Sequence, residues 1–123
     1  MNLSDIQNTL SSVKDWEDSY LKNGKQRLLG ESKNIRCEIM LGNKIESVII
    51  SFDSVEKEIL SITNLVSGSI EDSLRFFESA ATFVSSSSNT PYQENFQDYS
   101  LKIARIDYPD GGASVLYIQL LPE

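Results

Sequence analysis

Few side chains in this sequence could take part in catalysis. The chain has no histidine, which removes the commonest general base and metal ligand and, with it, the Ser-His-Asp and Cys-His nucleophile systems. Cys37 is the only cysteine, so neither an intrachain disulfide nor a zinc site of cysteine and histidine can form. Because Cys37 falls on the apolar face of a predicted strand, we expect a buried and inert thiol.

Two weaker patterns could indicate hydrolysis. Ser54 and Lys57 match the Ser-x-x-Lys pattern of penicillin-binding enzymes, but the companion Ser-Asp-Asn and Lys-Thr-Gly motifs are absent. Two carboxylates alone can support hydrolysis of a glycosidic bond, yet no pair of acids stands out. The sequence therefore predicts a protein that is not an enzyme and needs no cofactor or metal, with a carboxylate-only enzyme as the alternative.

The residues with the composition of a binding surface are aromatic and acidic. Thr90, Pro91 and Gln93 suit the first positions of a helix, so a short helix is predicted over 91–97, after a flexible connection at 85–89. Aromatic side chains beside acids are typical of interface hot spots. The alternative is that the aromatics cover the protein's own sheet. The candidate protein-binding residues are Tyr92, Glu94, Phe96, Asp98 and Tyr99, with Glu71 and Glu78 nearby.

Negative charge is concentrated in the middle of the chain. The net charge is −7, and residues 53–99 carry eight acids against two bases, whereas residues 1–52 carry seven of each. Direct binding of nucleic acid is disfavoured, because phosphate contacts need Lys and Arg, and a basic protein partner is favoured. Acids at predicted helix starts also stabilise the helix dipole, so a solvated acidic surface with no partner is the alternative.

Length and composition indicate one domain over residues 1–123, and the order of the predicted helices and strands, given below, makes it an α+β domain. A chain of 123 residues with 40% hydrophobic residues can bury a stable core without disulfides. The first ten residues lack the basic and apolar regions of a signal peptide, and the longest run of Val, Ile and Leu is only three residues. We therefore expect a cytoplasmic protein with no membrane partner.

An N-terminal helix is predicted up to Asn23-Gly24, with Ser4 and Gln7 as a capping box. Its apolar stripe could pack on the protein's own sheet or form a dimer seam. The stripe of this helix is Leu3, Ile6, Leu10, Val13, Trp16 and Tyr20.

The segment 22–36, which follows, is locally basic. We expect it to form a solvated loop with a short strand at 27–29, with a phosphate-binding patch as the alternative.

Two hairpins are predicted, over 35–52 and 101–120. With Gly42-Asn43 as the first turn, Cys37 pairs with Val48, and with a loop at 109–112, Leu101 pairs with Leu120. The second face of the first hairpin is only half polar, which predicts that a helix or a partner covers it. The face of that hairpin expected in the core is Ile35, Cys37, Ile39, Val48, Ile50 and Phe52.

Two further helices are predicted between the hairpins, each with a capping box: Asp53 with Glu56, and Ser69 with Asp72. Ser67-Gly68 separates them, so they form a helical hairpin. The buried stripe expected for the first is Val55, Ile59, Ile62 and Val66, and that for the second is Ile70, Leu74, Phe77, Ala81 and Val84, widened by Phe76, Ala80 and Phe83. The predicted fold is an antiparallel sheet of about four strands, packed by the N-terminal helix and this central helical hairpin.

These features favour a small, acidic, non-enzymatic protein-binding module. The most specific hypothesis is an inhibitor or immunity protein that neutralises a basic protein such as a nuclease toxin. The alternative is a homodimeric adaptor or secretion-type chaperone, with the first helix or the second hairpin face as the self-complementary surface. The sequence leaves open whether the chain is a monomer or a homodimer.

Overall fold

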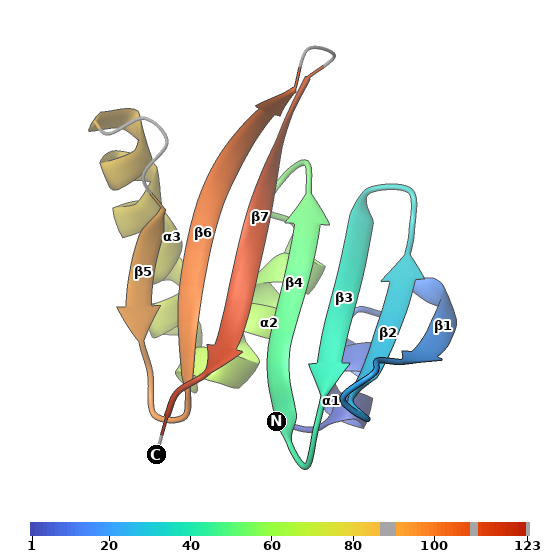
Figure 1. Cartoon of the computed structure of the whole chain (residues 1–123). Coiled ribbons are helices and arrows are strands. Elements are labelled where there is room, and N and C mark those ends of the chain that lie inside the picture. The colour runs from blue at the N-terminus through green and yellow to red at the C-terminus, as the bar shows by residue number, and fades with distance from the viewer. Residues whose placement is uncertain (87–90, 109–110, 123) are drawn as a thin grey trace.

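One antiparallel sheet of seven strands forms the framework of the molecule, which is a computed structural model describing residues 1–86, 91–108 and 111–122 (Figure 1). The elements are α1 (Leu3–Thr9), β1 (Lys14–Tyr20), β2 (Gln26–Glu31), β3 (Ile35–Leu41), β4 (Ile45–Phe52), α2 (Lys57–Ser67), α3 (Ile70–Ser86), β5 (Tyr92–Asn95), β6 (Tyr99–Tyr108) and β7 (Gly111–Leu120). The strand order is β1-β2-β3-β4-β7-β6-β5. No helix in the described residues is long and apolar enough to cross a membrane.

The predicted α+β class and antiparallel sheet are confirmed, but the expectation of about four strands is wrong. Strands β3–β4 and β6–β7 are the two predicted hairpins, and pairing of β4 with β7 joins them into one sheet. Of the three extra strands, β1 and β5 come from segments predicted as helix, and β2 comes from a segment predicted as a loop with a short strand at 27–29. Their backbone groups complete hydrogen-bond ladders at the two edges of the sheet.

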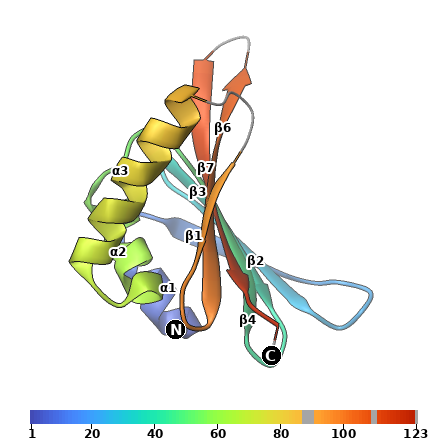
Figure 2. The same cartoon turned by 90° about the vertical axis from the view of Figure 1, so that its left-hand side faces the viewer.

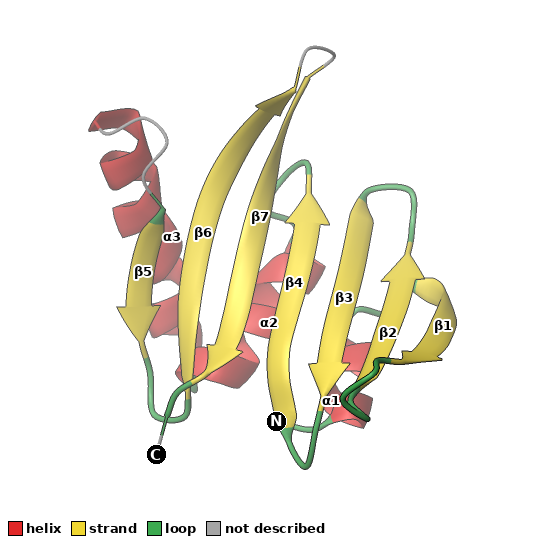
Figure 3. Cartoon of the chain, viewed as in Figure 1, coloured by secondary structure: helices red, strands yellow, loops and turns green. Residues whose placement is uncertain are grey.

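All three helices pack on the same face of the sheet, as the side view shows (Figure 2). Fully buried side chains from α1, α2 and α3 meet those of the central strands in one hydrophobic cluster. The members with no exposed surface include Ile6, Leu10, Ile39, Val48, Ile50, Ile59, Ile62, Phe76, Leu101, Leu116 and Ile118. The opposite face of the sheet carries no described helix (Figure 3).

The N-terminal helix is shorter than predicted, because α1 ends at Thr9. Its capping box is formed by Asn2 and Asp5, two residues before the predicted Ser4 and Gln7. Beyond it, the backbone N–H and the hydroxyl of Ser12 both donate to the carboxylate of Glu58 on α2, at 3.1 and 2.7 Å. Serine readily exchanges helical bonds for such contacts, and the chain leaves the helix here.

Strand β1 occupies the segment expected to complete that helix. It pairs with β2, and a bulge after Lys14 includes Asp15 at a φ of 57°. A side chain at Gly30 would come within 2.7 Å of both Val13 and Trp16, so the missing side chain makes room for these two residues. Tyr20, the last residue of the predicted helical stripe, is instead 75% exposed.

The basic segment forms a strand of six residues, β2, where only a short strand within a loop was expected. Two cations of this segment contact acids on β3 and β4. Arg27 lies 3.0 Å from Glu38, and Lys25 lies 2.7 Å from Glu46. These contacts favour a structural role for both bases over the alternative of a phosphate-binding patch.

The two hairpins place the predicted residues in the core, but both pairing registers differ from the prediction by two residues. Cys37 pairs with Ile50 where Val48 was expected, and Leu101 pairs with Ile118 where Leu120 was expected. A shift of two keeps side chains on their faces, because strand side chains alternate with a period of two. The exception is Ile45, where an irregularity in the pairing of β3 with β4 turns the side chain into the core. Residues 109–110 of the second predicted loop lie outside the described residues.

The helical pair between the hairpins is confirmed, with changes at the start of α2. Gly68, at a φ of 87°, ends α2 as predicted. However, α2 begins at Lys57, and its N-cap Glu56 makes no side-chain capping bond, so the box predicted for Asp53 and Glu56 is wrong. Val55 therefore precedes the helix and is exposed, although Ile59 and Ile62 are buried as expected.

Candidate protein-binding surface

Helix α3 has apolar side chains on two of its sides, and the sheet covers only one. Phe76 and Ala80 face the core and are almost completely buried. Ile70 and Leu74, four residues apart on a different side of the helix, are 58% and 51% exposed. Ala81 lies on the same stripe and is exposed, and Phe77 between them is partly exposed. An apolar stripe of this kind faces solvent in the single chain.

This arrangement corrects the predicted orientation of α3. The stripe expected in the core was Ile70, Leu74, Phe77, Ala81 and Val84, and the described structure leaves Ile70, Leu74 and Ala81 outside. The side chain of Val84 lies outside the described residues. The helix turns Phe76 inward, where its ring packs at 5.4 Å from the rings of both Phe77 and Tyr92. The sequence did contain an indication of this, because the apolar residues of α3 cover more of the helix circumference than one buried face can hold.

Acidic side chains accompany the exposed stripe. Glu71 and Glu78, both predicted as binding residues, are exposed on α3. They lie three residues before and four residues after Leu74, which makes them its neighbours on the helix surface. We call Ile70, Leu74, Phe77 and Ala81, together with Glu71 and Glu78, the α3 outer surface.

The segment predicted as a helix over 91–97 is wrong in type, because its residues 92–95 form strand β5. β5 pairs with β6, from Tyr92 opposite Ile103 to Asn95 opposite Ser100. The half-buried side chains of Tyr92 and Glu94 alternate with the exposed Gln93 and Asn95. The ring of Tyr92 packs between Phe76 and Phe83 of α3, at 5.4 and 5.7 Å.

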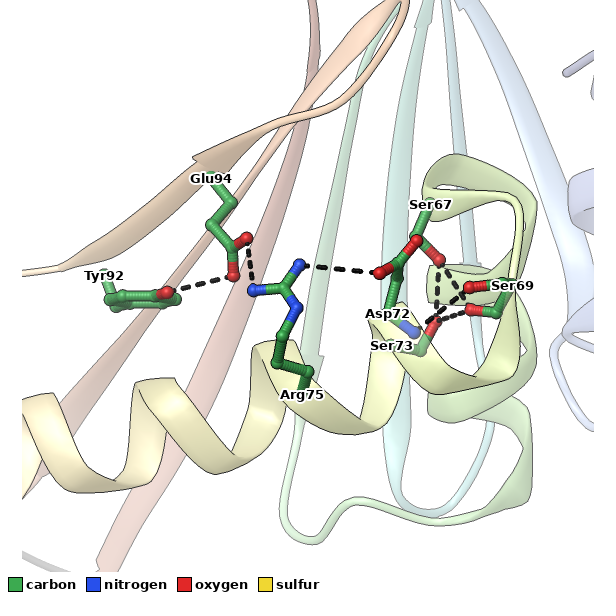
Figure 4. A network of polar contacts seen from close by, with 7 residues as sticks. All are labelled: Ser67, Ser69, Asp72, Ser73, Arg75, Tyr92 and Glu94. Carbon is green, nitrogen blue, oxygen red and sulfur yellow. Dashed lines mark hydrogen bonds and ion pairs between the residues drawn. The ribbon is translucent and has the colours of Figure 1, made fainter.

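A polar contact fixes α3 to β5 on the other side of the helix (Figure 4). Arg75 lies 2.7 Å from the carboxylate of Glu94 and 3.8 Å from that of Asp72, and the hydroxyl of Tyr92 donates to Glu94 at 2.9 Å. Glu94 raises the pKa of Arg75 through this hydrogen bond and its charge. Burial, followed by the bond to Glu94, raises the pKa of Tyr92. Glu94 is thus engaged within the chain.

The junction between α2 and α3 is held by serine hydroxyls (Figure 4). The Ser69 hydroxyl accepts from the backbone N–H of Asp72 at 3.1 Å, which is one of the two bonds of the predicted capping box. The hydroxyls of Ser67 and Ser73 lie 2.9 Å apart, and both lie within hydrogen-bond distance of the carbonyl oxygen of Ser69, at 2.9 and 3.2 Å. Each hydroxyl has one proton, so the two protons serve two of these three contacts at a time. Ser73 is fully buried. These bonds fix where α3 starts and so help to position Ile70 and Leu74.

The remaining predicted residues lie at the turn between β5 and β6. Phe96 packs against the core cluster, and Tyr99 is only 8% exposed, with its hydroxyl donating to the carbonyl oxygen of Ile45 at 3.1 Å. Asp98 is exposed. The structure therefore places the three aromatics against the protein's own core and brings only Glu71 and Glu78 together on an exposed apolar surface.

An open depression of about 1160 Å³ lies at the end of the sheet near the N-terminus. The start of α1, the turns after β3 and β5, and the end of β7 line it with mixed polar and apolar side chains, Asp98 and Tyr99 among them. Within the part of the chain that the structure describes, no three His, Cys, Asp or Glu side chains are grouped to hold a metal ion.

Comparison with protein-family models, curated proteins and solved structures gives no match for this chain. The inference of function therefore rests on its own residues. Two features of these residues are most informative: the apolar stripe on α3 that the sheet does not cover, and the acids beside it.

Proposed function

We propose that the chain is a non-enzymatic protein-binding module of the inhibitor or immunity type, which neutralises a basic protein such as a nuclease toxin. The observation that carries this proposal is the α3 outer surface, where Ile70 and Leu74 are more than half exposed beside two acids. Apolar side chains at the centre of an interface contribute most of the binding energy, and charges around them steer the encounter.

Charge complementarity favours a basic occupant. Residues 53–99 carry a net charge of −6, from eight acids and two bases. Of those bases, Arg75 already contacts Glu94 and Asp72. A second copy placed on this surface would bring Glu71 and Glu78 of both chains together, and like charges at short range oppose binding. Lysine or arginine side chains of a different protein would instead pair with these acids.

In the proposed mechanism, the α3 outer surface inhibits the nuclease by covering the basic side chains that bind its substrate. A nuclease binds its substrate through basic side chains that contact phosphates. The α3 outer surface would dock beside such side chains, with Ile70 and Leu74 in an apolar recess and the acids opposite the bases that otherwise bind phosphate. Nucleic acid and inhibitor would then compete for the same cations.

Affinity capture from the source cell tests the proposal, at low salt and in about 1 M salt. We expect a basic protein to be captured at low salt and largely lost at high salt. With that protein purified, replacement of both Ile70 and Leu74 by Ser, or of both Glu71 and Glu78 by Lys, should weaken binding at least about tenfold. Tyr20→Ser is the matched control, because Tyr20 is also exposed but lies on β1, at the far edge of the sheet.

Two results would contradict the proposal. One is capture that survives molar salt unchanged, because the acids would then have no part in it. The other is binding of a basic protein that the α3 variants and the Tyr20 control affect equally. Since Ile70 and Leu74 are mostly exposed, their replacement should change the free energy of unfolding by only about 0.5 kcal/mol each, so lost binding would not reflect unfolding.

A further inference from the structure

We call the face of the sheet opposite the helices, which is toward the viewer in Figure 3, the open face. The strand pairing places apolar residues at its centre. No described helix lies on it, and the side view shows all three helices on the other side (Figure 2). Its central side chains are half-buried by their own neighbours in the sheet, and only Val115 among them is buried. Among the residues whose side chains the structure describes, the apolar ones on this open face are Leu29, Met40, Ile49, Ala104, Val115 and Tyr117.

One row across this face has charges placed symmetrically about its centre. Ile49 of β4 and Tyr117 of β7 pair at the middle of the row. Glu38 is the neighbour of Ile49 on β3, and Lys102 is the neighbour of Tyr117 on β6, with its ammonium 5.0 Å from the centre of that ring. Each charged residue therefore lies one strand out from the central pair, about 7 Å from the line between β4 and β7.

A twofold axis along that line makes the row complementary to itself. Rotation about an axis parallel to the strands, between β4 and β7, places Ile49 over Tyr117 of a second copy. The same rotation places Glu38 over Lys102 of that copy, and Lys102 over its Glu38. Sheets packed face to face lie about 10 Å apart, a gap that these long side chains can bridge. Such an isologous contact is the commonest arrangement in homodimers.

The charge of the open face also differs from that of the helical side. Strands β2, β3 and β6 place three bases on it, Arg27, Arg36 and Lys102, against two acids, Glu31 and Glu38. This face thus lacks the acidic excess of residues 53–99, and a basic partner has no electrostatic preference for it. A second copy docked on this face would contact its apolar centre and would place Glu38 and Lys102 opposite side chains of the other sign.

We propose that the chain forms a homodimer through this open face, with Glu38 and Lys102 of each copy paired across the interface. The dimer has four layers: helices, sheet, sheet, helices. Because the helices lie outermost, the α3 outer surfaces of both copies remain accessible. The inference does not depend on the proposed function, but if both hold, one dimer presents two binding surfaces.

The mass of the full chain in solution tests this directly. At a concentration on the order of 100 μM, sedimentation or light scattering should give twice the 13.8 kDa of one chain. A mass of one chain at this concentration overturns the proposal. The result requires no substitution, so it holds even if a variant fails to fold.

Charge exchange then identifies the face. Glu38→Lys places two lysines opposite each other, and Lys102→Glu does the same with two glutamates, so each variant alone should dimerise at least about tenfold more weakly. An equimolar mixture of the two should form a heterodimer. In that pair one chain carries lysine at both positions and the other carries glutamate at both, so every charge meets its opposite across the interface.

The mixture also controls for lost contacts within one chain. Glu38→Lys removes the ion pair with Arg27, and that loss persists in the heterodimer. Glu71→Lys is the matched control, because it makes the same charge change on the helical side and should leave the dimer intact. If neither single variant weakens the dimer, or if the mixture remains monomeric, the chains associate through another surface and the proposal fails.

Discussion

Tyr99 shows how one side chain of the predicted binding segment serves the fold instead. Its hydroxyl donates to the carbonyl oxygen of Ile45, which links the start of β6 to the start of β4. The side chain is almost fully buried, and burial raises its pKa, with a smaller contribution from the charge of Asp98. The folded protein therefore favours the neutral phenol, the form that donates this hydrogen bond.

Tyr99→Phe should lower the free energy of unfolding by about 1 kcal/mol at neutral pH, because it removes one buried hydrogen bond and leaves the Ile45 carbonyl without this donor. An unfolded tyrosine ionises near pH 10, whereas folded Tyr99 ionises at higher pH. Its contribution is therefore complete below about pH 10 and is lost as the pH rises through the pKa of the folded state.

Urea unfolding at neutral pH and above pH 10 measures both effects. We expect the wild-type chain to lose more stability than the variant over this interval, so that their difference shrinks. Tyr20→Phe is the control, because that exposed side chain should leave stability unchanged at neutral pH. A difference between wild type and Tyr99→Phe that is constant with pH would contradict the assignment.

At the scale of elements, the spacing of apolar residues along the sequence could not by itself distinguish a helix from a strand at two places. Tyr92, Phe96 and Tyr99 fit a helix at steps of four and three residues, but Tyr92, Glu94 and Phe96 fit a strand at steps of two equally well. Pairing with β6 decides for the strand. The second place is the segment after α1, where Val13 and Trp16 belong to the predicted helical stripe. The chain instead continues into β1, which pairs with β2, and the side chains of Val13 and Trp16 lie against Gly30.

Gly30→Ala should destabilise the attachment of β1 to β2. The added methyl group would lie 2.7 Å from both Val13 and Trp16, and relieving such overpacking costs about 1–3 kcal/mol. We expect a corresponding fall in the free energy of unfolding and a change in Trp16 fluorescence, since Trp16 is the only tryptophan.

Gly42→Ala supplies the matched control for this prediction. Its added methyl group would meet only the side chain of Glu46, at 2.8 Å, and a flexible carboxylate can move away. We expect a smaller loss of stability and unchanged fluorescence. If both variants lost equal stability, the space above Gly30 would not be what holds β1 in place.

At the scale of the whole molecule, net charge and the exposed stripe act against each other. The chain carries −7 at neutral pH, and this charge opposes association through the α3 stripe, although Ile70 and Leu74 remain exposed there. The isoelectric point is near 4.5, where this repulsion vanishes. An apolar stripe without opposing charge then favours association.

Lowering the pH from 7 toward 4.5 should therefore produce assemblies larger than a dimer, as light scattering would show. Replacing both Ile70 and Leu74 by Ser should reduce this scattering at equal concentration, with Tyr20→Ser as the control for a distant exposed side chain. Equal scattering from all three proteins would mean that the stripe takes no part in acid-induced association.

The α+β class, the two central hairpins and the face that each hairpin buries could all be predicted from the amino-acid sequence. Strand alternation has a period of two, so a register error of two residues leaves side chains on the correct face, except at Ile45, where the pairing is irregular. The acidic centre of the chain and the end of α2 at Gly68 could also be predicted from the sequence. Both depend on single residues: the charge of each side chain, and the ability of glycine to adopt a positive φ.

The edges of the sheet and the orientation of α3 depended instead on contacts between distant residues. An edge strand needs a neighbour for its hydrogen bonds, and the neighbour of β5 is β6, whose place in the sheet depends on the pairing of β7 with β4. Helix α3 is apolar on two sides, so its periodicity allows either side to be buried. The rings of Phe76 and Tyr92 meet in the core, and this contact leaves Ile70 and Leu74 at the surface.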